Sequence, residues 1–244
     1  MMNMKTLVIL QSNYLPWKGY FDLMAVADEF VLFDEVQFTR RDWRNRNRIV
    51  LDGKLHWLTV PVQAKGNYQA PIRDIEVADP DEAAKHWATV RHAYRKAPHF
   101  EEISDTLEQP FSDATSLTRL SAVNRLFLMK LAGLLGIATP FVESTVVPRT
   151  TDDPTERLIE ICQGRGANHY VSGPAARAYI DKSRFEAAGI KLSYANYEGY
   201  PVYDQGGGAF EHGVSVIDLL MRVGPAARAH LKSLRNRSSF LVPA

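Results

Sequence analysis

The opening of the chain alternates between the period of a strand and the period of a helix, and this alternation limits the fold more than any other feature. Thr6–Leu10 is a short apolar run, residues 18–27 place apolar side chains at helical spacing, and residues 30–33 form a second apolar run. A strand, a loop, a helix and a strand in this order make the unit that builds parallel sheets.

The same alternation returns after residue 140. We expect strands at Phe141–Glu143, His169–Ser172 and 190–194, and helices at 153–164, 183–188 and 214–223. Right-handed crossovers between these units predict an α/β fold with a mostly parallel open sheet, Rossmann-like or nucleotidyltransferase-like, and helices on both faces.

Two segments depart from this plan within what we expect to be a single domain, residues 1–244. Residues 48–51 and 56–62 flank Asp52-Gly53, whose positive φ angles favour a small antiparallel hairpin. A helical insertion at about 79–136 is predicted from periodic stretches at 83–97, 100–107 and 116–135. The polar tail at 235–244 is expected to fray.

Composition excludes several classes of function. The chain has 29 basic and 28 acidic side chains, so any site for phosphate or nucleic acid must come from local clustering. Cys162 is the one cysteine, which excludes an intramolecular disulfide, and the histidine spacings predict no metal site. No signal peptide and no run of ~18 apolar residues is found, so we expect a cytoplasmic protein without a membrane span.

The stretch QSNYLPWKGYF follows the first strand, where ligands bind in open parallel sheets. It supplies five candidate substrate-binding residues: Gln11, Asn13, Tyr14, Trp17 and Lys18. Free amides at the start of the next helix suit phosphate. The alternative is that the aromatic residues only fasten the helix to the sheet and the amides cap it.

Asp34 and Gln37 follow the second strand, and their side chains are expected in the same crevice. Asp34 is suited to hold a ribose hydroxyl or an amine, or to act as a general base if burial raises its pKa. An ion pair with Arg46 or Arg48 is the structural alternative. His92 and His56 are further candidates for the base, although a structural histidine is more common.

Five arginines lie between Arg40 and Arg48, together with Trp43. In an extended strand Asn45 and Asn47 share one face, and Arg44, Arg46 and Arg48 share the other. Guanidinium groups pair with phosphate oxygens through two parallel bonds, so a diphosphate or an RNA backbone would suit this strip. The alternative is a solvated edge strand whose charges prevent aggregation.

Ser172 and Gly173 follow another predicted strand and are expected at the same edge of the sheet. Ser172 lacks the Gly-x-Ser-x-Gly context of a nucleophile, so contact with phosphate or substrate is the better interpretation. The chain also has no Gly-x-Gly-x-x-Gly and no Walker loop.

Taken together, the segments QSNYLPWKGYFDL, FVLFDEVQF, RDWRNRNRI with HWLTVPV, HAYRKAPHF, HYVSG and VSVIDLLMRVG resemble the WbqC-like family over nearly the whole chain. Ser12 departs from the Gln-Pro that usually opens the family's motif. The positions that match are Gln11, Asn13, Tyr14, Trp17, Asp34, Gln37, Asn45, Arg46, Asn47, Ser172 and Gly173.

The resemblance implies a transferase of surface polysaccharide or related biosynthesis. Such an enzyme would add an acyl or aminoacyl group, glycyl among them, to the amine of a small acceptor such as a nucleotide-linked amino sugar. The donor would be an aminoacyl-tRNA, an acyl-thioester or an adenylate, and no other cofactor is firmly implied. Two alternatives stay open: an ATP-dependent nucleotidyl-activating enzyme, although residues 11–19 contain no histidine, and a non-catalytic sugar-nucleotide-binding accessory protein.

Overall fold

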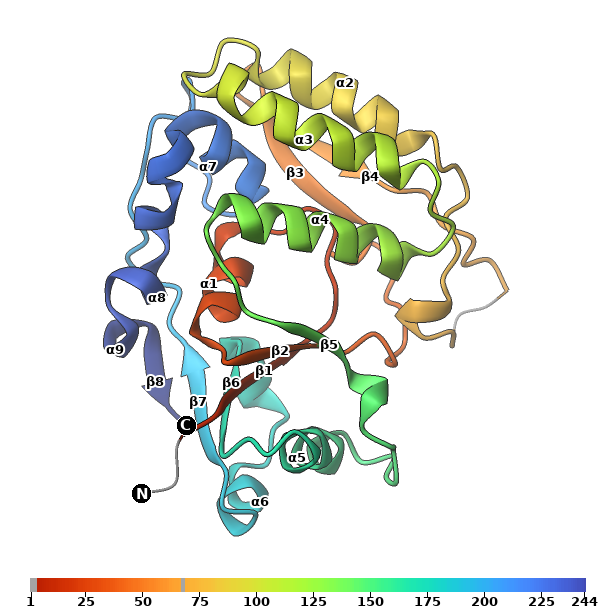
Figure 1. Ribbon diagram of the computed structural model, residues 1–244, viewed down its shortest axis with the longest axis vertical. Coiled ribbons are helices and arrows are strands. Elements are labelled where there is room, and N and C mark those ends of the chain that lie inside the picture. The colour runs from red at the N-terminus through yellow and green to blue at the C-terminus, as the bar shows by residue number, and fades with distance from the viewer. Residues whose placement is uncertain (1–3, 67–68) are drawn as a thin grey trace.

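A computed structural model describes residues 4–66 and 69–244 and contains a six-stranded sheet as its central layer (Figure 1). The strand order is β5-β2-β1-β6-β7-β8, with every neighbouring pair parallel except β7 and β8. The strands are β1 (Thr6–Leu10), β2 (Glu29–Leu32), β5 (Phe141–Glu143), β6 (His169–Ser172), β7 (Lys191–Ala195) and β8 (Leu241–Pro243). The predicted mostly parallel α/β sheet is therefore confirmed.

Helices cover both faces of this sheet. In Figure 1, α1 (Lys18–Val26) and α4 (Leu120–Leu134) lie above it, and α5 (Pro154–Gly164) and α6 (Lys182–Ala187) lie below it. Helix α5 begins as the sequence predicts, because Pro154 occupies its first turn and the Asp153 side chain accepts a hydrogen bond from the Glu156 amide.

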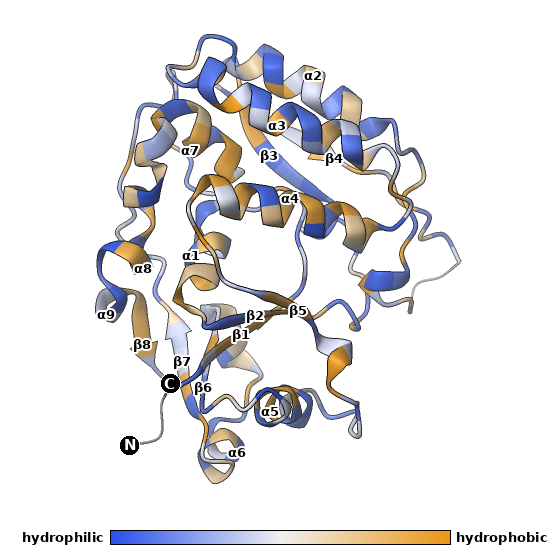
Figure 2. Ribbon diagram, viewed as in Figure 1, coloured by the Kyte–Doolittle hydropathy of each residue, from blue (hydrophilic) through white to orange (hydrophobic). Residues whose placement is uncertain are grey.

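Alternate residues of each strand enter different hydrophobic cores. Val8 and Phe30 pack with α1, with the helical insertion and with α7 (Val216–Val223), whereas Leu7 and Val31 pack with α5 and α6. Figure 2 shows the apolar colour concentrated on β1, β2 and β5. This double burial explains why the strands read as continuous apolar runs.

The antiparallel hairpin forms a separate two-stranded sheet from β3 (Arg46–Leu51) and β4 (Lys54–Thr59). Asp52 and Gly53 both have positive φ, at 50° and 71°, as the Asp-Gly turn predicts. β4 ends three residues earlier than the expected position 62, and Val62 instead pairs with Val77 outside the hairpin.

The helical insertion contains α2 (Glu82–Tyr94), α3 (Phe100–Ala114) and α4. α3 continues seven residues beyond the predicted end at 107, because Leu107, Phe111 and Ala114 are all buried on one face. Pro110 lies inside this helix, so tertiary packing outweighs its breaking tendency.

The C-terminal tail corrects one expectation. Residues 235–244 do not fray: they contain α9 (Arg237–Phe240) and β8, and Phe240 is fully buried. Short 3-10 segments and α8 (Lys232–Arg235) connect α7 to this edge strand. Across residues 4–66 and 69–244, each helix is too short or too polar to cross a lipid bilayer.

Candidate functional site

Four parallel strands end at one edge of the sheet, and each is followed by polar residues. Gln11 follows β1, Asp34 follows β2, Glu143 ends β5 and Ser172 ends β6. The loop after β1 is tightly constrained, because Leu15 adopts a positive φ of 45° immediately before Pro16. Such a conformation is rare for a bulky residue and occurs where surrounding contacts enforce it.

Hydrogen bonds tie this loop to its neighbours. The Ser12 amide donates to Asp34 Oδ1 at 2.8 Å, and Arg44 donates to the side-chain oxygens of Asn13 and, at 3.2 Å, Gln11. Asn124 of α4 donates to Ser12 Oγ at 3.0 Å and to the Arg44 carbonyl at 2.9 Å. Segments from four parts of the sequence are thus fixed in one arrangement.

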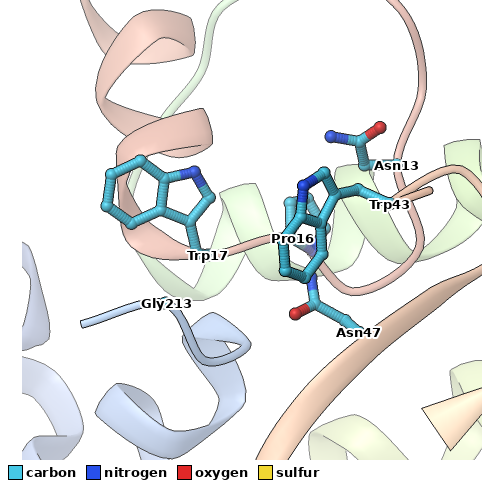
Figure 3. A pocket seen from close by; sticks show the side chains of 6 residues that line it. All are labelled: Asn13, Pro16, Trp17, Trp43, Asn47 and Gly213. Carbon is cyan, nitrogen blue, oxygen red and sulfur yellow. The ribbon is translucent and has the colours of Figure 1, made fainter. Parts of the chain in front are cut away.

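A cleft of about 280 Å³ opens beside this loop. Its lining comes from the loop, from the arginine-rich segment and from the chain before α7: Asn13, Pro16, Trp17, Trp43, Asn47 and Gly213. We call it the aromatic cleft. In the view of Figure 3 the Trp43 indole overlaps Pro16, the Trp17 indole lies to one side, and the side chains of Asn13 and Asn47 lie above and below Trp43.

The position of Trp17 in this cleft depends on close packing. Its ring lies edge-to-face on Tyr197, with 4.9 Å between centroids, and covers Gly19. A Cβ at position 19 would lie 2.2 Å from the indole, so only glycine fits there. Asn47 is fixed too, since its Nδ2 donates to the Tyr14 carbonyl at 3.2 Å. An aromatic slot bordered by amides suits a sugar or a heterocyclic ring.

A second cavity, of about 480 Å³, lies at the ends of β2 and β5. We call it the carboxylate cavity. Residues that line it include the acids Asp34, Glu35 and Glu143 and the arginines Arg73, Arg119 and Arg125. It therefore presents both charges to a ligand.

Asp34 is the most unusual group in the carboxylate cavity. The side chain is 2% exposed, and its Oδ2 has no hydrogen-bond partner among the described residues. Burial raises the pKa of Asp34, against the opposing effects of the Ser12 amide and the Arg44 charge. The structural alternative, an ion pair of Asp34 with Arg46 or Arg48, is not formed: Arg46 donates to the Arg41 carbonyl, and Arg48 lies 3.8 Å from Glu211.

Glu143 shares this environment. Burial and the neighbouring Asp34 carboxylate raise the pKa of Glu143, although Arg125 lies 3.1 Å away and opposes the shift. A carboxyl group whose ionisation is disfavoured by a neighbouring carboxylate binds a cation well, because the cation relieves the repulsion.

Lys18 lies near the aromatic cleft but is buried. Its Nζ is 3.1 Å from His212 Nδ1 and within 5.2–5.6 Å of the ring centroids of Tyr200, Tyr203 and Phe210. Burial lowers the pKa of Lys18 to about 8, although the carboxylates of Asp218 and Asp22 act in the opposite direction. Lys18 is not among the residues that line the aromatic cleft, so it supports the cleft wall from behind.

Of the other predicted residues, some lie near the carboxyl ends of the parallel strands and others lie far from them. Tyr14 is wholly buried and its hydroxyl is 2.8 Å from His86 Nδ1, so it lies in the core rather than in the cleft. Asn45 lines a third cavity, of about 380 Å³, with Arg40 and Arg41. Arg46 lies on the outer face of the hairpin, with its guanidinium 4.3 Å from the ring centroid of Trp57.

Neither candidate histidine joins the site. His56 is exposed on β4, and His92 is exposed on α2.

Gln37 pairs through its backbone with Pro71 beyond the carboxylate cavity. Ser172 is buried and accepts a hydrogen bond from Tyr170 at 3.2 Å, while Gly173 lies against Tyr197. The expected single crevice is therefore two separate cavities along one edge.

Several residues of the site are not predicted from the sequence. Glu143, Arg73, Arg119 and Arg125 enter the carboxylate cavity through distant contacts that no local pattern signals. Asn124 carried a usable signal, because it is a polar residue on the apolar face of an amphipathic helix and is fully buried.

The chain was compared with known protein families, curated proteins and solved structures. The sequence model of the WbqC-like protein family matches residues 11–230. The uncharacterized protein Rv1507c of Mycobacterium tuberculosis is 44% identical over 232 residues, which cover 95% of this chain and all of that relative. No solved structure matches.

Proposed function

The chain belongs to the WbqC-like protein family, and from this membership and the two cavities we propose that it transfers an acyl or aminoacyl group to a small amine. The acceptor is a nucleotide-linked amino sugar or a compound of similar chemistry, and glycyl is the group to test first. The context would be the biosynthesis of a surface polysaccharide or a related product.

The observation that supports an amine acceptor is that Asp34 and Glu143 line the same cavity. Asp34 is buried, its Oδ2 lacks a partner among the described residues, and both carboxyl groups have raised pKa values. A substrate ammonium would supply the missing hydrogen bond and offset the repulsion. A carboxylate with a raised pKa is also the stronger base, as deprotonation of an amine requires.

In the proposed reaction the bound ammonium first releases one proton to solvent, and Asp34 removes a second proton from the acceptor nitrogen as it attacks. The nitrogen lone pair attacks the donor carbonyl carbon, an amide bond forms, and the bond from this carbon to the donor oxygen or sulfur breaks. The proton passes from Asp34 to the leaving group or to solvent. No oxidant or reductant takes part.

The remaining walls suit the other parts of such substrates. The arginines of the carboxylate cavity are suited to phosphate oxygens, although Arg119 and Arg125 each have a carboxylate within 3.5 Å that a ligand would need to displace. The aromatic cleft is suited to a sugar or a base. Arg44 joins the two cavities through Asn13, which lines the cleft, and through its charge near Asp34.

The test is mass spectrometry of reactions that combine amino-sugar nucleotides with glycyl-tRNA, acyl-thioester or adenylate donors. We expect the acceptor to gain the mass of one acyl group. In Asp34→Asn the rate should fall by at least about a hundredfold, the usual range for loss of a general base, while calorimetry still detects the acceptor, bound more weakly because Glu143 is then its one carboxylate partner of the two. Asp105→Asn, on the exposed side of α3, should match the parent protein.

Other outcomes favour the alternatives. ATP–pyrophosphate exchange in the absence of acceptor would indicate nucleotidyl activation, since simple transfer produces none. Binding of a sugar nucleotide without turnover across all donors would favour an accessory protein. An Asp34→Asn variant that keeps full activity would remove the proposed base.

A further inference from the structure

The outer face of the hairpin carries exposed indoles and half-buried guanidinium groups, and apart from Trp43 the proposed transfer does not use them. Arg48 pairs directly with Trp57, and Arg46 with Thr59, so these side chains project from the same face. Trp57 is 42% exposed, and Trp43, from the loop before β3, is 39% exposed. We call Trp43, Arg46, Arg48 and Trp57 the hairpin patch.

The hairpin patch is assembled before any ligand arrives. The two indoles stack with 5.7 Å between centroids and 30° between planes. Arg46 lies 4.3 Å from the centroid of Trp57, and Arg48 lies 5.6 Å and 5.5 Å from Trp43 and Trp57. Side chains already held in place lose less conformational entropy on binding.

The charge around the patch is strongly positive, although the whole chain is nearly neutral. Five arginines lie between Arg40 and Arg48. Two carboxylates approach them, Asp42 at 3.8 Å from Arg44 and Glu211 at 3.8 Å from Arg48. A local excess of arginine beside exposed indoles matches a chain of phosphates that carries accessible bases.

We propose that the hairpin patch binds single-stranded nucleic acid, with unpaired bases stacked on Trp57 and Trp43 and phosphates held by the arginines. A duplex would not satisfy the indoles, because its bases already stack on each other. Trp43 also lines the aromatic cleft, so the end of a bound strand would lie at the mouth of that cleft. An RNA-borne aminoacyl donor would arrive by this route, but the binding itself does not depend on the proposed function.

Fluorescence anisotropy of a labelled oligouridylate of about ten nucleotides tests the proposal. Affinity should fall steeply as salt rises, and a duplex RNA of equal length should bind more weakly. The same measurement is made with a single-stranded DNA of matched length. Binding of either oligonucleotide supports the proposal, and the one with the higher affinity shows whether ribose or deoxyribose is preferred. UMP is the competitor, and displacement by it at the same concentration as the oligonucleotide would instead indicate a mononucleotide site.

Variants separate stacking from charge. Trp57→Ala should weaken binding by about tenfold or more, and Trp57→Phe should retain most of it because a ring remains. Arg46→Gln should weaken binding and reduce the salt slope by about 1. Arg91→Gln on α2 and Val202→Ala, both at exposed positions that are not part of the hairpin patch, are the matched controls.

If Trp57→Ala keeps the affinity of the parent protein while Arg46→Gln loses affinity, the patch binds polyanions through charge alone. That result would overturn the proposal. Equal binding of the duplex would do the same. Oligonucleotide binding without acyl transfer would count against the proposed function alone, whereas transfer from small donors without oligonucleotide binding would count against the hairpin patch alone.

Discussion

At the scale of the single residue, Asp34 is both the proposed general base and a group that lowers the stability of the fold. Its raised pKa means that the folded protein disfavours the ionised form, so this group weakens the fold as pH rises through and above its ordinary range. Asn keeps the oxygen that accepts from the Ser12 amide and removes the buried charge. Sites that bind or react often carry such a cost.

We therefore predict that Asp34→Asn unfolds at a higher urea concentration than the parent protein at pH 7.5. The difference should shrink as pH falls towards 4, because the parent carboxyl then becomes neutral. Urea titrations across this pH range measure it, with Asp105→Asn as the exposed control. A variant that is less stable at pH 7.5 would show that the ionised group is well solvated.

Lys18 gives a second prediction at this scale. Its pKa is lowered to about 8 by burial, so between pH 8 and about 10.5 the unfolded chain binds a proton that the folded protein lacks. Over this window the parent protein should gain stability relative to Lys18→Met, by at most about 3 kcal/mol. Urea titrations at several pH values test this, and Lys130→Met on the exposed side of α4 should show no such trend.

At the scale of the element, one buried ion pair joins α5 to the loops after β2 and β5. Arg157 is 2% exposed and donates to both carboxylate oxygens of Glu35, at 2.7 and 3.1 Å. It also donates to the carbonyls of Ser144 and Val147. These bonds hold the floor of the carboxylate cavity, since Glu35 and Ser144 both line it.

Replacing Arg157 by Met should destabilise the protein by about 3–5 kcal/mol, because Glu35 would remain buried without its partner. Burial alone would raise the pKa of Glu35, but the hydrogen bonds from Arg157 and Ser144 lower it below the ordinary value. This part of the stability is present above about pH 4.5 and is lost as pH falls further. Thermal unfolding at pH 7 and pH 4 measures both effects, and a loss that persists unchanged at pH 4 would contradict the electrostatic explanation.

The edge strand β8 offers another prediction for an element. It pairs with β7 from Ser193 to Ala195 and is the one antiparallel neighbour in the described sheet. Ending the chain after Phe240 should cost about 2 kcal/mol through lost ladder bonds and should expose the edge of β7. Thermal unfolding and size-exclusion chromatography would report lower stability and concentration-dependent association, whereas removal of Ala244 alone should have a smaller effect.

At the scale of the whole molecule, apolar periodicity was enough to predict the parallel strands and most helices. It failed where long-range contacts decide the structure: Pro110 stays helical because Phe111 packs in the core, and residues 241–243 become a strand because β7 lies beside them. The site likewise has features that the local sequence pattern predicts and features that only long-range contacts determine. The position of Asp34 at a strand end was readable, but its separation from the aromatic cleft depends on how α4 and the loop after β1 pack.

The two cores of the sheet differ in their connection to the site. Phe127 of α4 and Phe185 of α6 are both fully buried, one in each core. Phe127 packs edge-to-face on Tyr14, with 5.5 Å between centroids, whereas Phe185 stacks on Tyr170 at 5.4 Å. The backbone of Tyr14 in turn donates to the Trp43 carbonyl at 3.0 Å and accepts from Asn47. The larger core is therefore mechanically joined to the aromatic cleft.

We predict that Phe127→Leu loosens the loop after β1 and that Phe185→Leu does not, although both remove a similar buried volume and should each cost about 1–3 kcal/mol. Hydrogen exchange followed by mass spectrometry should show faster exchange of the amides at residues 12–14 in Phe127→Leu alone, because Ser12 and Tyr14 donate the bonds that hold the loop. Comparable stability of the two variants makes each the control for the other. Equal acceleration in both would mean that the loop opens only with global unfolding, and the aromatic cleft would then be as rigid as the sheet that carries it.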